Sequence, residues 1–433
     1  MSYSSSVLSL LKRIGAGEGD VLRVKSGDME YSGILMPHHE FSQPDILIIK
    51  LRSGYNVGIR VSETASVELV KKASKKEKEP RAPLVGDRSK KEVTIIGTGG
   101  TIASYVDYRT GAVHPALSAG ALVMAVPEIA DICNVSAEVL FSIFSENMKV
   151  ENWQKLAIRI AERIGEGAEG CIVPHGTDTM GYTSAALSFM LEDLPKPVVV
   201  VGAQRSSDRP SSDAYTNLLS AARFIVESDA AETFLMMHES PSDLVALVHR
   251  GTRARKMHTS RRDAFKSVNA SPVARIHFEG GIEYLAPYRR KSNGKVRLRT
   301  EMEENVALIS FYPGMRADVF EDLMLKHRGV VIAGSGLGHV SAEMVMSVKK
   351  AVEAGTCVVM TSQCLNGRVN LNVYDTGRDL LSAGVIPGGD MLPETAYVKL
   401  MWVLAQAKSD DEVREMMRTD LRGELSSRRE LDG

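Results

Sequence analysis

Two threonines stand where a chemically active hydroxyl group would be placed in an open α/β sheet. Thr101 lies in the run Thr98-Gly-Gly-Thr-Ile-Ala-Ser104, and Thr177 lies in the run His175-Gly-Thr-Asp-Thr-Met180. Each run follows a short apolar stretch that ends in a tight turn, and such sheets bind ligands at the carboxyl ends of their strands. We therefore predict that the two hydroxyl groups face one crevice.

An amide hydrolase that works through a hydroxyl group needs a proton acceptor and hydrogen-bond donors for the oxyanion. Gly99 and Gly100 precede Thr101, so the backbone can approach a substrate closely and offer N–H groups. Asp178 follows Thr177 and can orient a cationic partner or bind a substrate ammonium group. The same residues can also serve structure alone, as a tight turn before Thr101 and as a helix cap at Thr177 and Asp178.

A nucleotide-binding loop is the main rival interpretation of the glycines. Gly97 and Gly99 fit the first two positions of the dinucleotide fingerprint, but Ile102 occupies the third. The Gly-Lys-Ser/Thr ending of a phosphate-binding loop does not follow either. The sequence therefore indicates neither a bound cofactor nor a metal site in this chain.

Composition limits the partners that this crevice can serve. The chain has 433 residues, of which 44% are hydrophobic and 25% charged, as is typical of globular domains. Its 53 Lys and Arg residues balance 54 Asp and Glu residues, so no overall field attracts nucleic acid or an anionic membrane. The run Val7–Leu11 is too short for a signal peptide or a membrane span, and four scattered cysteines suit reduced thiols. We expect a cytoplasmic protein without membrane contact.

A charged linker divides a small N-terminal module from the rest of the chain. Residues 71–92 are rich in Lys and Glu and almost free of large apolar residues. Before them, four β-branched runs spaced about ten residues apart follow an apolar helical pattern over residues 7–14. We predict a small β-barrel module at 1–75 and a linker at 76–92. The basic residues of the linker either form a solvated tether or contact RNA phosphates.

From Val93 onwards the sequence repeats a strand, a turn and an amphipathic helix. Apolar runs rich in β-branched residues occur at 93–97, 139–144, 170–174, 197–202, 233–237, 306–311, 329–334 and 356–361. Such runs are buried on both faces of a parallel sheet, so helices must cover both sides. We predict a doubly wound parallel sheet in an α/β domain over 93–300, followed by a smaller C-terminal α/β lobe over 301–433.

The two threonine motifs, in this order and at this distance, resemble the bacterial-type L-asparaginase family. The resemblance runs from about Val93 to Leu421. It rests on the motifs TGGTIAS at 98–104, NMKVENW at 147–153, HGTDTM at 175–180, VVVVGAQR at 198–205 and AFKSVN at 264–269. It implies an asparaginase-like fold and hydrolysis of a side-chain carboxamide.

The resemblance also implies roles for individual residues. Thr101 is implied to be the nucleophile, while Thr177, Asp178 and Lys266 are implied to form a second group that activates a hydroxyl group or water. Which of Thr101 and Thr177 attacks first stays open. The residues implied to bind the substrate are Ser145, Asp178, Gly100 and Gly176.

One departure from the asparaginase family concerns the segment after the first threonine. The family has a tyrosine there, whereas residues 112–114 of this chain align with that position, and Tyr105 and Tyr108 lie nearer to Thr101. The tyrosine partner of Thr101 therefore stays open. A loop without its complete active conformation in the isolated chain is expected of an amidase that becomes active only when a partner binds.

Within this family, the β-rich module, the basic linker and the run 362–370 resemble the D subunit of archaeal glutamyl-tRNA(Gln) amidotransferase. This resemblance implies a glutaminase that passes ammonia to an E subunit, which uses ATP and Mg²⁺ to convert Glu-tRNA(Gln) to Gln-tRNA(Gln). It also implies a homodimer of this chain, a D2E2 complex, and tRNA(Gln) contact mainly through the E subunit. Cys364 is expected to be a packed or wall residue, not a thiol nucleophile.

Two other functions remain open beside this one. A stand-alone L-asparaginase is the first, because glutamine and asparagine differ by one methylene, worth only about 1–3 kcal/mol in a fitted pocket. An RNA-binding or docking module that precedes a degenerate amidase is the second. Glutamine is the substrate that the D-subunit resemblance implies.

Overall fold

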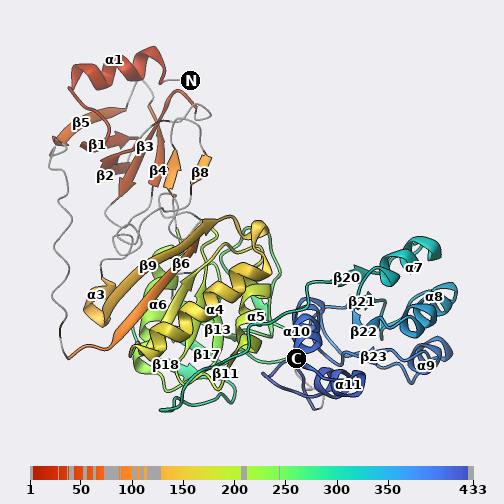
Figure 1. Cartoon of the computed structure of the whole chain (residues 1–433). Helices are drawn as coiled ribbons and strands as arrows, with labels where there is room; N and C mark the ends of the chain where they lie inside the picture. The colour runs from red at the N-terminus through yellow and green to blue at the C-terminus, as the bar shows by residue number, and fades with distance from the viewer. Residues whose placement is uncertain are drawn as a thin grey trace.

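The structure is a computed structural model of the chain. It describes residues 3–27, 29–36, 38, 43–51, 56–61, 65–72, 87, 89–99, 105–107, 112–114, 128–205, 212–242 and 244–427. Along the chain these form an N-terminal antiparallel sheet, a large α/β lobe and a smaller C-terminal α/β lobe (Figure 1). Gly100, Thr101, Tyr108 and most of the predicted linker lie outside the described residues.

The N-terminal region is a five-stranded antiparallel sheet with one helix. Helix α1 (Ser5–Arg13) begins at Ser4, whose side chain accepts a hydrogen bond from the Val7 N–H, and it ends before Gly15, which has φ +64°. The strands are β1 (Val21–Ser26), β2 (Met29–Leu35), β3 (Ile46–Leu51), β4 (Asn56–Arg60) and β5 (Ser66–Lys71), in the order β4-β3-β2-β1-β5. Val7 of the helix packs with Leu22 and Leu47 in one small core. The predicted helix and the β-rich character of this module are confirmed.

The large lobe is built on an eight-stranded sheet. Its strands are β6 (Glu92–Gly99), β9 (Asn134–Ile143), β10 (Gly170–Pro174), β12 (Val198–Val201), β13 (Thr233–His238), β14 (Val245–Arg250), β17 (Ala274–His277) and β18 (Ile282–Tyr284). The order is β18-β17-β14-β13-β12-β10-β6-β9, and the five strands from β13 to β9 run parallel. Strands β14, β17 and β18 extend the sheet by antiparallel pairing, which the sequence did not predict.

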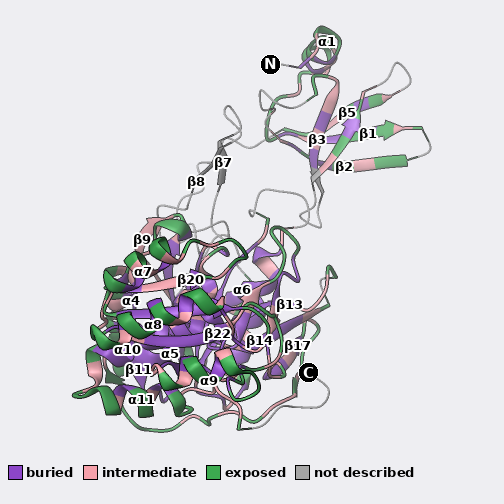
Figure 2. Cartoon of the chain, turned by 90° about the vertical axis from the view of Figure 1, so that its right-hand side faces the viewer, coloured by how far each residue is buried: buried purple, intermediate pink, exposed green. Residues whose placement is uncertain are grey.

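Helices cover both faces of this sheet, as predicted for a doubly wound domain. Helices α4 (Val150–Gly165) and α5 (Met180–Met190) pack on one face, and α3 (Ile129–Ile132) and α6 (Ala214–Glu227) pack on the other. Helix α4 is one of the amphipathic helices, and its apolar face is buried at Trp153, Leu156, Ala157 and Ile160. Figure 2 shows the buried residues concentrated in the strands and the inner sides of the helices.

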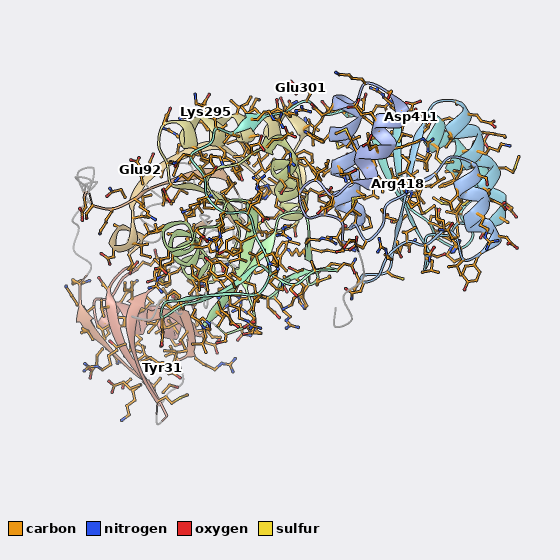
Figure 3. The ribbon with its side chains drawn as sticks, turned by 90° about the horizontal axis from the view of Figure 1, so that it is seen from below. Tyr31, Glu92, Lys295, Glu301, Asp411 and Arg418 are labelled. Carbon is orange, nitrogen blue, oxygen red and sulfur yellow. The ribbon has the colours of Figure 1, made fainter. Side chains whose placement is uncertain are left out.

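The C-terminal lobe is a four-stranded parallel sheet. Its strands are β20 (Val306–Ser310), β21 (Gly329–Gly334), β22 (Cys357–Ser362) and β23 (Ile386–Pro387). Helices α7 (Ala317–Leu325), α8 (Ala342–Glu353) and α9 (Asp375–Ser382) share one core with the sheet, and α10 (Pro393–Gln406) and α11 (Asp410–Arg418) share another. Figure 3 shows Asp411 and Arg418 of α11 at the opposite end of the molecule from Tyr31 of β2.

Helix α10 joins the two lobes. It packs on α5 of the large lobe and on the sheet of the C-terminal lobe, and Phe189 stacks on Trp402 with ring centroids 5.8 Å apart. Aromatic packing of this kind contributes beyond the apolar area that it buries. The two lobes therefore share one continuous core at this helix.

Candidate active site

Thr177 lies at the carboxyl end of β10, between the ends of the neighbouring strands β6 and β12. Its methyl group packs against Gly202, where an added Cβ atom would lie only 2.6 Å from Thr177 Cγ2. A side chain at position 202 would therefore displace Thr177. Because the methyl group occupies that side, the hydroxyl group turns away from β12.

Three side chains with complementary chemistry meet at this point. Lys256 Nζ lies 2.8 Å from Thr177 Oγ1 and 2.7 Å from Asp178 Oδ1. The Lys256 side chain is 14% exposed, whereas the Asp178 side chain is 71% exposed. An amine in this position donates to the hydroxyl oxygen when it is charged and can take the hydroxyl proton when it is neutral. The exposed Asp178 carboxylate can still accept hydrogen bonds from a cationic group of a ligand.

The structure corrects the prediction for Lys266, which does not lie with Thr177 and Asp178. Its Nζ atom donates to the Glu239 carbonyl oxygen at 3.1 Å and to Asp263 Oδ2 at 3.3 Å. The reason is strand alternation in the hairpin of β15 (Ala254–Lys256) and β16 (Phe265–Ser267). Lys266 pairs with Arg255 and so shares its face, while Lys256 points to the other face.

Arg253 anchors this hairpin where β15 begins. Its side chain is 2% exposed and donates to the Gly423 carbonyl oxygen at 2.7 Å, to Asp390 Oδ2 at 3.0 Å and to Ser426 Oγ at 2.9 Å. Residues of the C-terminal lobe and the C-terminal segment therefore hold the start of the strand that carries Lys256. Such buried charge-assisted hydrogen bonds are strong and fix geometry.

Ser145 and Gly176, two of the predicted substrate-binding residues, lie together beside Thr177. Ser145 begins the short 3₁₀ helix η2 (Ser145–Asn147) directly after β9, and its side chain is almost fully buried. An added Cβ atom at Gly176 would lie 2.9 Å from Ser145 Oγ, so only glycine fits there. Thr179 Oγ1 donates to the Ser145 carbonyl oxygen at 2.6 Å and connects the two segments. Substrate binding by these residues stays a prediction.

His175 lies fully buried beneath this edge. Its Nδ1 atom is 2.6 Å from the Gly176 carbonyl oxygen, and its Nε2 atom is 2.9 Å from Thr183 Oγ1. Burial lowers the pKa of His175 to about 4, so the ring is neutral at physiological pH. The ring is a fixed support of the Gly176 backbone and not an exposed acid or base.

The described part of the first motif reaches the same edge. Thr98 Oγ1 donates to the Pro174 carbonyl oxygen at 2.8 Å, which connects the ends of β6 and β10. Gly99 has φ +111°, and an added Cβ atom there would clash with the Ile143 carbonyl oxygen, so only glycine is tolerated. Gly100 and Thr101 lie outside the described residues, so the predicted nucleophile and the predicted shared crevice stay predictions.

The segment after this motif contains the pair of strands β7 (Tyr105–Asp107) and β8 (Ala112–His114). They run antiparallel, with Tyr105 opposite His114. The backbone register places Tyr105 and the aligned residues 112–114 on one ribbon, while Tyr108 lies outside the described residues. Which of them, if any, is the partner of Thr101 stays open.

The cysteines and other potential metal ligands lie apart from one another in the described ranges. Within these ranges, no three His, Cys, Asp or Glu side chains are grouped so that they could hold a metal ion. No helix in the same part of the chain is long and apolar enough to cross a membrane. Cys364 is exposed, so it is not the packed residue that was one of the two expectations, while the wall position stays a prediction; Cys133 and Cys171 are buried.

Sequence profiles of known families match three parts of the chain. The profile described as "Asparaginase, N-terminal" matches residues 92–289, "Glutaminase/Asparaginase C-terminal domain" matches 305–417, and "GatD N-terminal domain" matches 16–70. The D subunit of glutamyl-tRNA(Gln) amidotransferase from Pyrococcus furiosus is 52% identical over 97% of each chain. The corresponding protein of Saccharolobus islandicus is 46% identical over 100% of this chain and 98% of its own.

The chain belongs to the family of glutamyl-tRNA(Gln) amidotransferase D subunits. Solved structures relate this D-subunit fold to free asparaginases. The thermostable L-asparaginase from Thermococcus kodakarensis has a TM-score of 0.69 and 30% identity, and covers 78% of this chain and 100% of its own. L-asparaginase I from Vibrio cholerae has a TM-score of 0.68 and 30% identity, over 78% and 99%. The resemblance and the fold class that the sequence predicted are confirmed.

Sequence reasoning missed one residue of the candidate site, Lys256. Lys256 and Lys266 both lie in short strands, and both stand near Ser residues in the sequence. The pairing register of β15 with β16 separates the two lysines, and the contact of Lys256 with Thr177 shows which one faces the site. A predicted hairpin between residues 254 and 267 would have been the signal, since it places the two lysines on opposite faces.

Proposed function

We propose that this chain is the glutamine-hydrolysing subunit of a tRNA-dependent amidotransferase. The observation that carries the proposal is the contact of the Lys256 amine with the Thr177 hydroxyl group and the Asp178 carboxylate. This cluster lies in a chain that matches D-subunit relatives over nearly its full length. Hydroxyl, amine and carboxylate are the groups that hydrolysis of a carboxamide needs.

In the proposed reaction, a threonine hydroxyl group attacks the side-chain carboxamide carbon of glutamine. The hydroxyl proton passes to a neighbouring amine, which delivers it to the amide nitrogen so that ammonia leaves. Water then hydrolyses the acyl-enzyme to release glutamate. Lys256 is the amine beside Thr177, and Thr101 is the nucleophile that the resemblance implies. The open carboxylate of Asp178 binds the α-ammonium group of glutamine, and Ser145 and Gly176 hold its α-carboxylate end.

The proposal includes a partner, because released ammonia must be captured before it is lost. An E subunit takes the ammonia and uses ATP and Mg²⁺ to convert Glu-tRNA(Gln) to Gln-tRNA(Gln). This chain forms a homodimer within a D2E2 complex in the cytoplasm, and the E subunit makes most contacts with tRNA. The match of residues 16–70 to the "GatD N-terminal domain" profile supports this assembly over a free asparaginase.

Ammonia release from L-glutamine and from L-asparagine tests the function. The chain is assayed alone and then together with the E subunit, ATP and Glu-tRNA(Gln). We expect glutamine to be the better substrate and its hydrolysis to rise when the partner and tRNA are added. Hydrolysis of asparagine at full rate by the chain alone would favour the L-asparaginase alternative, which the structural neighbours at 30% identity make the second candidate.

The threonine nucleophile has its own test in the same assay. Thr101→Ala and Thr177→Ala are each expected to abolish ammonia release, with Thr216→Ala as the matched control. Thr216 is buried, and its hydroxyl group contacts His238 on the other side of the sheet. A parent chain that releases no ammonia, with no further change in either site variant, would leave the chain as a docking module with a degenerate amidase.

A further inference from the structure

A chain of three buried side chains runs from helix α4 to the backbone beside Thr177. Trp153 Nε1 lies 2.9 Å from Thr183 Oγ1, which lies 2.9 Å from His175 Nε2. His175 Nδ1 lies 2.6 Å from the Gly176 carbonyl oxygen. The helices α4 and α5, which carry Trp153 and Thr183, lie side by side on one face of the sheet (Figure 1).

With a neutral His175 ring, only one arrangement of protons satisfies all three of these hydrogen bonds. The Gly176 carbonyl oxygen can only accept, so His175 Nδ1 must carry a proton and donate it. In the neutral ring Nε2 is then an acceptor, so the Thr183 hydroxyl group donates to it. The Thr183 oxygen remains free to accept from the Trp153 indole N–H, which can only donate.

This arrangement acts on the peptide unit that joins Gly176 to Thr177. A peptide unit is planar, so fixing the Gly176 carbonyl group also fixes the direction of the Thr177 N–H. Glycine backbone is otherwise free to rotate, and Gly176 has room for no side chain beside Ser145. The His175 ring is therefore the group that holds this flexible peptide on its buried side.

We propose that Trp153, Thr183 and His175 are positioning residues that aim the Thr177 N–H and hydroxyl group into the substrate site. Of these three residues, only His175 contacts the site, through the Gly176 carbonyl oxygen. Thr183 and Trp153 act through His175 by fixing its tautomer and the plane of its ring. The inference rests on the proposed function for its kinetic test and on the fold alone for its spectroscopic test.

The decisive variant is Thr183→Val, which keeps the shape of the side chain and removes the hydroxyl group. We expect kcat for ammonia release from glutamine to fall at least tenfold while KM stays within twofold, because orientation and not binding is lost. Thr183→Ser retains the hydroxyl group and is expected to restore kcat to within threefold of the parent. Assays use the complex with the E subunit and Glu-tRNA(Gln).

The matched control is Ser188→Ala on the same helix. The Ser188 hydroxyl group is also buried but donates to the Ser184 carbonyl oxygen at 2.7 Å, away from His175. We expect this variant to keep its kcat even where it loses thermal stability. An equal fall of kcat in the Ser188 and Thr183 variants would show that loss of packing explains both, and would overturn the proposal.

The tautomer is measured without substrate by ¹⁵N NMR of labelled histidine in the intact chain. We expect the Nδ1–H tautomer for His175 in the parent and in Thr183→Ser, and a mixed or altered signal in Thr183→Val. An Nε2–H tautomer in the parent would overturn the proposal whatever the enzyme hydrolyses. Should Thr183→Val fail to fold, Trp153→Phe removes the indole N–H that donates to Thr183, and an unchanged kcat there would contradict the positioning role of these three side chains.

Failure of the proposed function would look different. A parent chain that releases no ammonia from glutamine, yet shows the Nδ1–H tautomer and its loss in Thr183→Val, would remove the glutaminase assignment and leave the backbone support intact. A parent that is active, with a Thr183→Val variant of unchanged kcat, would remove the positioning role alone.

Discussion

Two lysine–carboxylate pairs in this chain have similar distances and opposite surroundings. In the candidate active site, Lys256 Nζ lies 2.7 Å from Asp178 Oδ1, and the Asp178 side chain is 71% exposed. Near the C-terminus, Lys399 Nζ lies 2.6 Å from Glu424 Oε1, and both side chains are fully buried. Distance alone does not distinguish a reactive pair from a structural one.

The remaining hydrogen-bonding capacity separates the two pairs. Lys399 also donates to the carbonyl oxygens of Met417 and Thr419, and Glu424 accepts from the backbone N–H groups of Leu421 and Arg422. All of these partners belong to the protein, so the buried pair fastens the C-terminal segment to helix α10. The pair in the site keeps a carboxylate edge open to solvent and a hydroxyl group within reach of the amine.

The comparison predicts its largest effect for Lys256→Met. Removing a positioned proton acceptor costs about 10²- to 10⁴-fold in rate, so we expect kcat for ammonia release to fall by about 10³-fold. Thermal stability should change little, because a pair with an exposed carboxylate contributes only about 0–1 kcal/mol. Steady-state kinetics of the complex and calorimetry of the variant measure the two quantities.

Lys266→Met is the matched control for this variant. Lys266 lies on the opposite face of the same hairpin and contacts Asp263 and the Glu239 carbonyl oxygen. We expect it to retain most of the activity. A loss as large as that of Lys256→Met would mean that the hairpin, and not the amine at position 256, determines the rate.

The buried pair should show the reverse pattern in Lys399→Met. The change leaves Glu424 charged, buried and without its cation, which costs about 3–5 kcal/mol. Urea denaturation followed by circular dichroism measures this loss, while kcat per folded molecule is expected to stay near the parent value. Adding Glu424→Gln should recover part of the stability, and a loss below about 1 kcal/mol in the single variant would contradict the structural role.

Most of the fold could be predicted because its central strands carry a local signal. The apolar runs predicted at 170–174 and 329–334 are the strands β10 and β21 with the same bounds. Strands β14 and β17 were missed because their own local signal is weak. His249 and Arg250 interrupt the apolar run of β14, and β17 is four residues long.

The candidate site could be predicted only in part. Ser145, Gly176, Thr177 and Asp178 follow strands directly, so their positions at the sheet edge follow from local sequence. Lys256 reaches them from a hairpin that is held by long-range contacts, including those of Arg253 with Asp390 and Gly423. A one-residue shift in such a register moves every side chain to the other face, which no local pattern reveals.

Asp178→Asn tests whether the open carboxylate of the site pair binds substrate. Loss of a charge-assisted hydrogen bond to an ammonium group costs about 1.5–3 kcal/mol, so we expect KM for glutamine to rise about 10- to 100-fold. Asp263→Asn is the control, since Asp263 pairs with Lys266 and Arg261 and not with Lys256. A rise of KM in the control variant, or none in Asp178→Asn, would remove Asp178 from substrate binding.

Glu138 provides an intermediate case between the two pairs, with the smallest expected effect. Hydrogen bonds from Arg163 and Arg159 lower the pKa of Glu138 from 4.5 to about 2, and its side chain is 22% exposed. Because the folded pKa lies below the unfolded one, the stabilisation is present above pH 4.5 and is lost as pH falls towards about 2. Water still reaches these ions and screens them, so we expect Glu138→Gln to lose only about 1 kcal/mol at pH 7. Urea denaturation of parent and variant at pH 7, 4 and 3 should show that the difference in their free energies of unfolding becomes smaller as the pH falls. A difference that stays constant over this range would mean that the carboxylate charge contributes nothing and that shape alone holds the cluster.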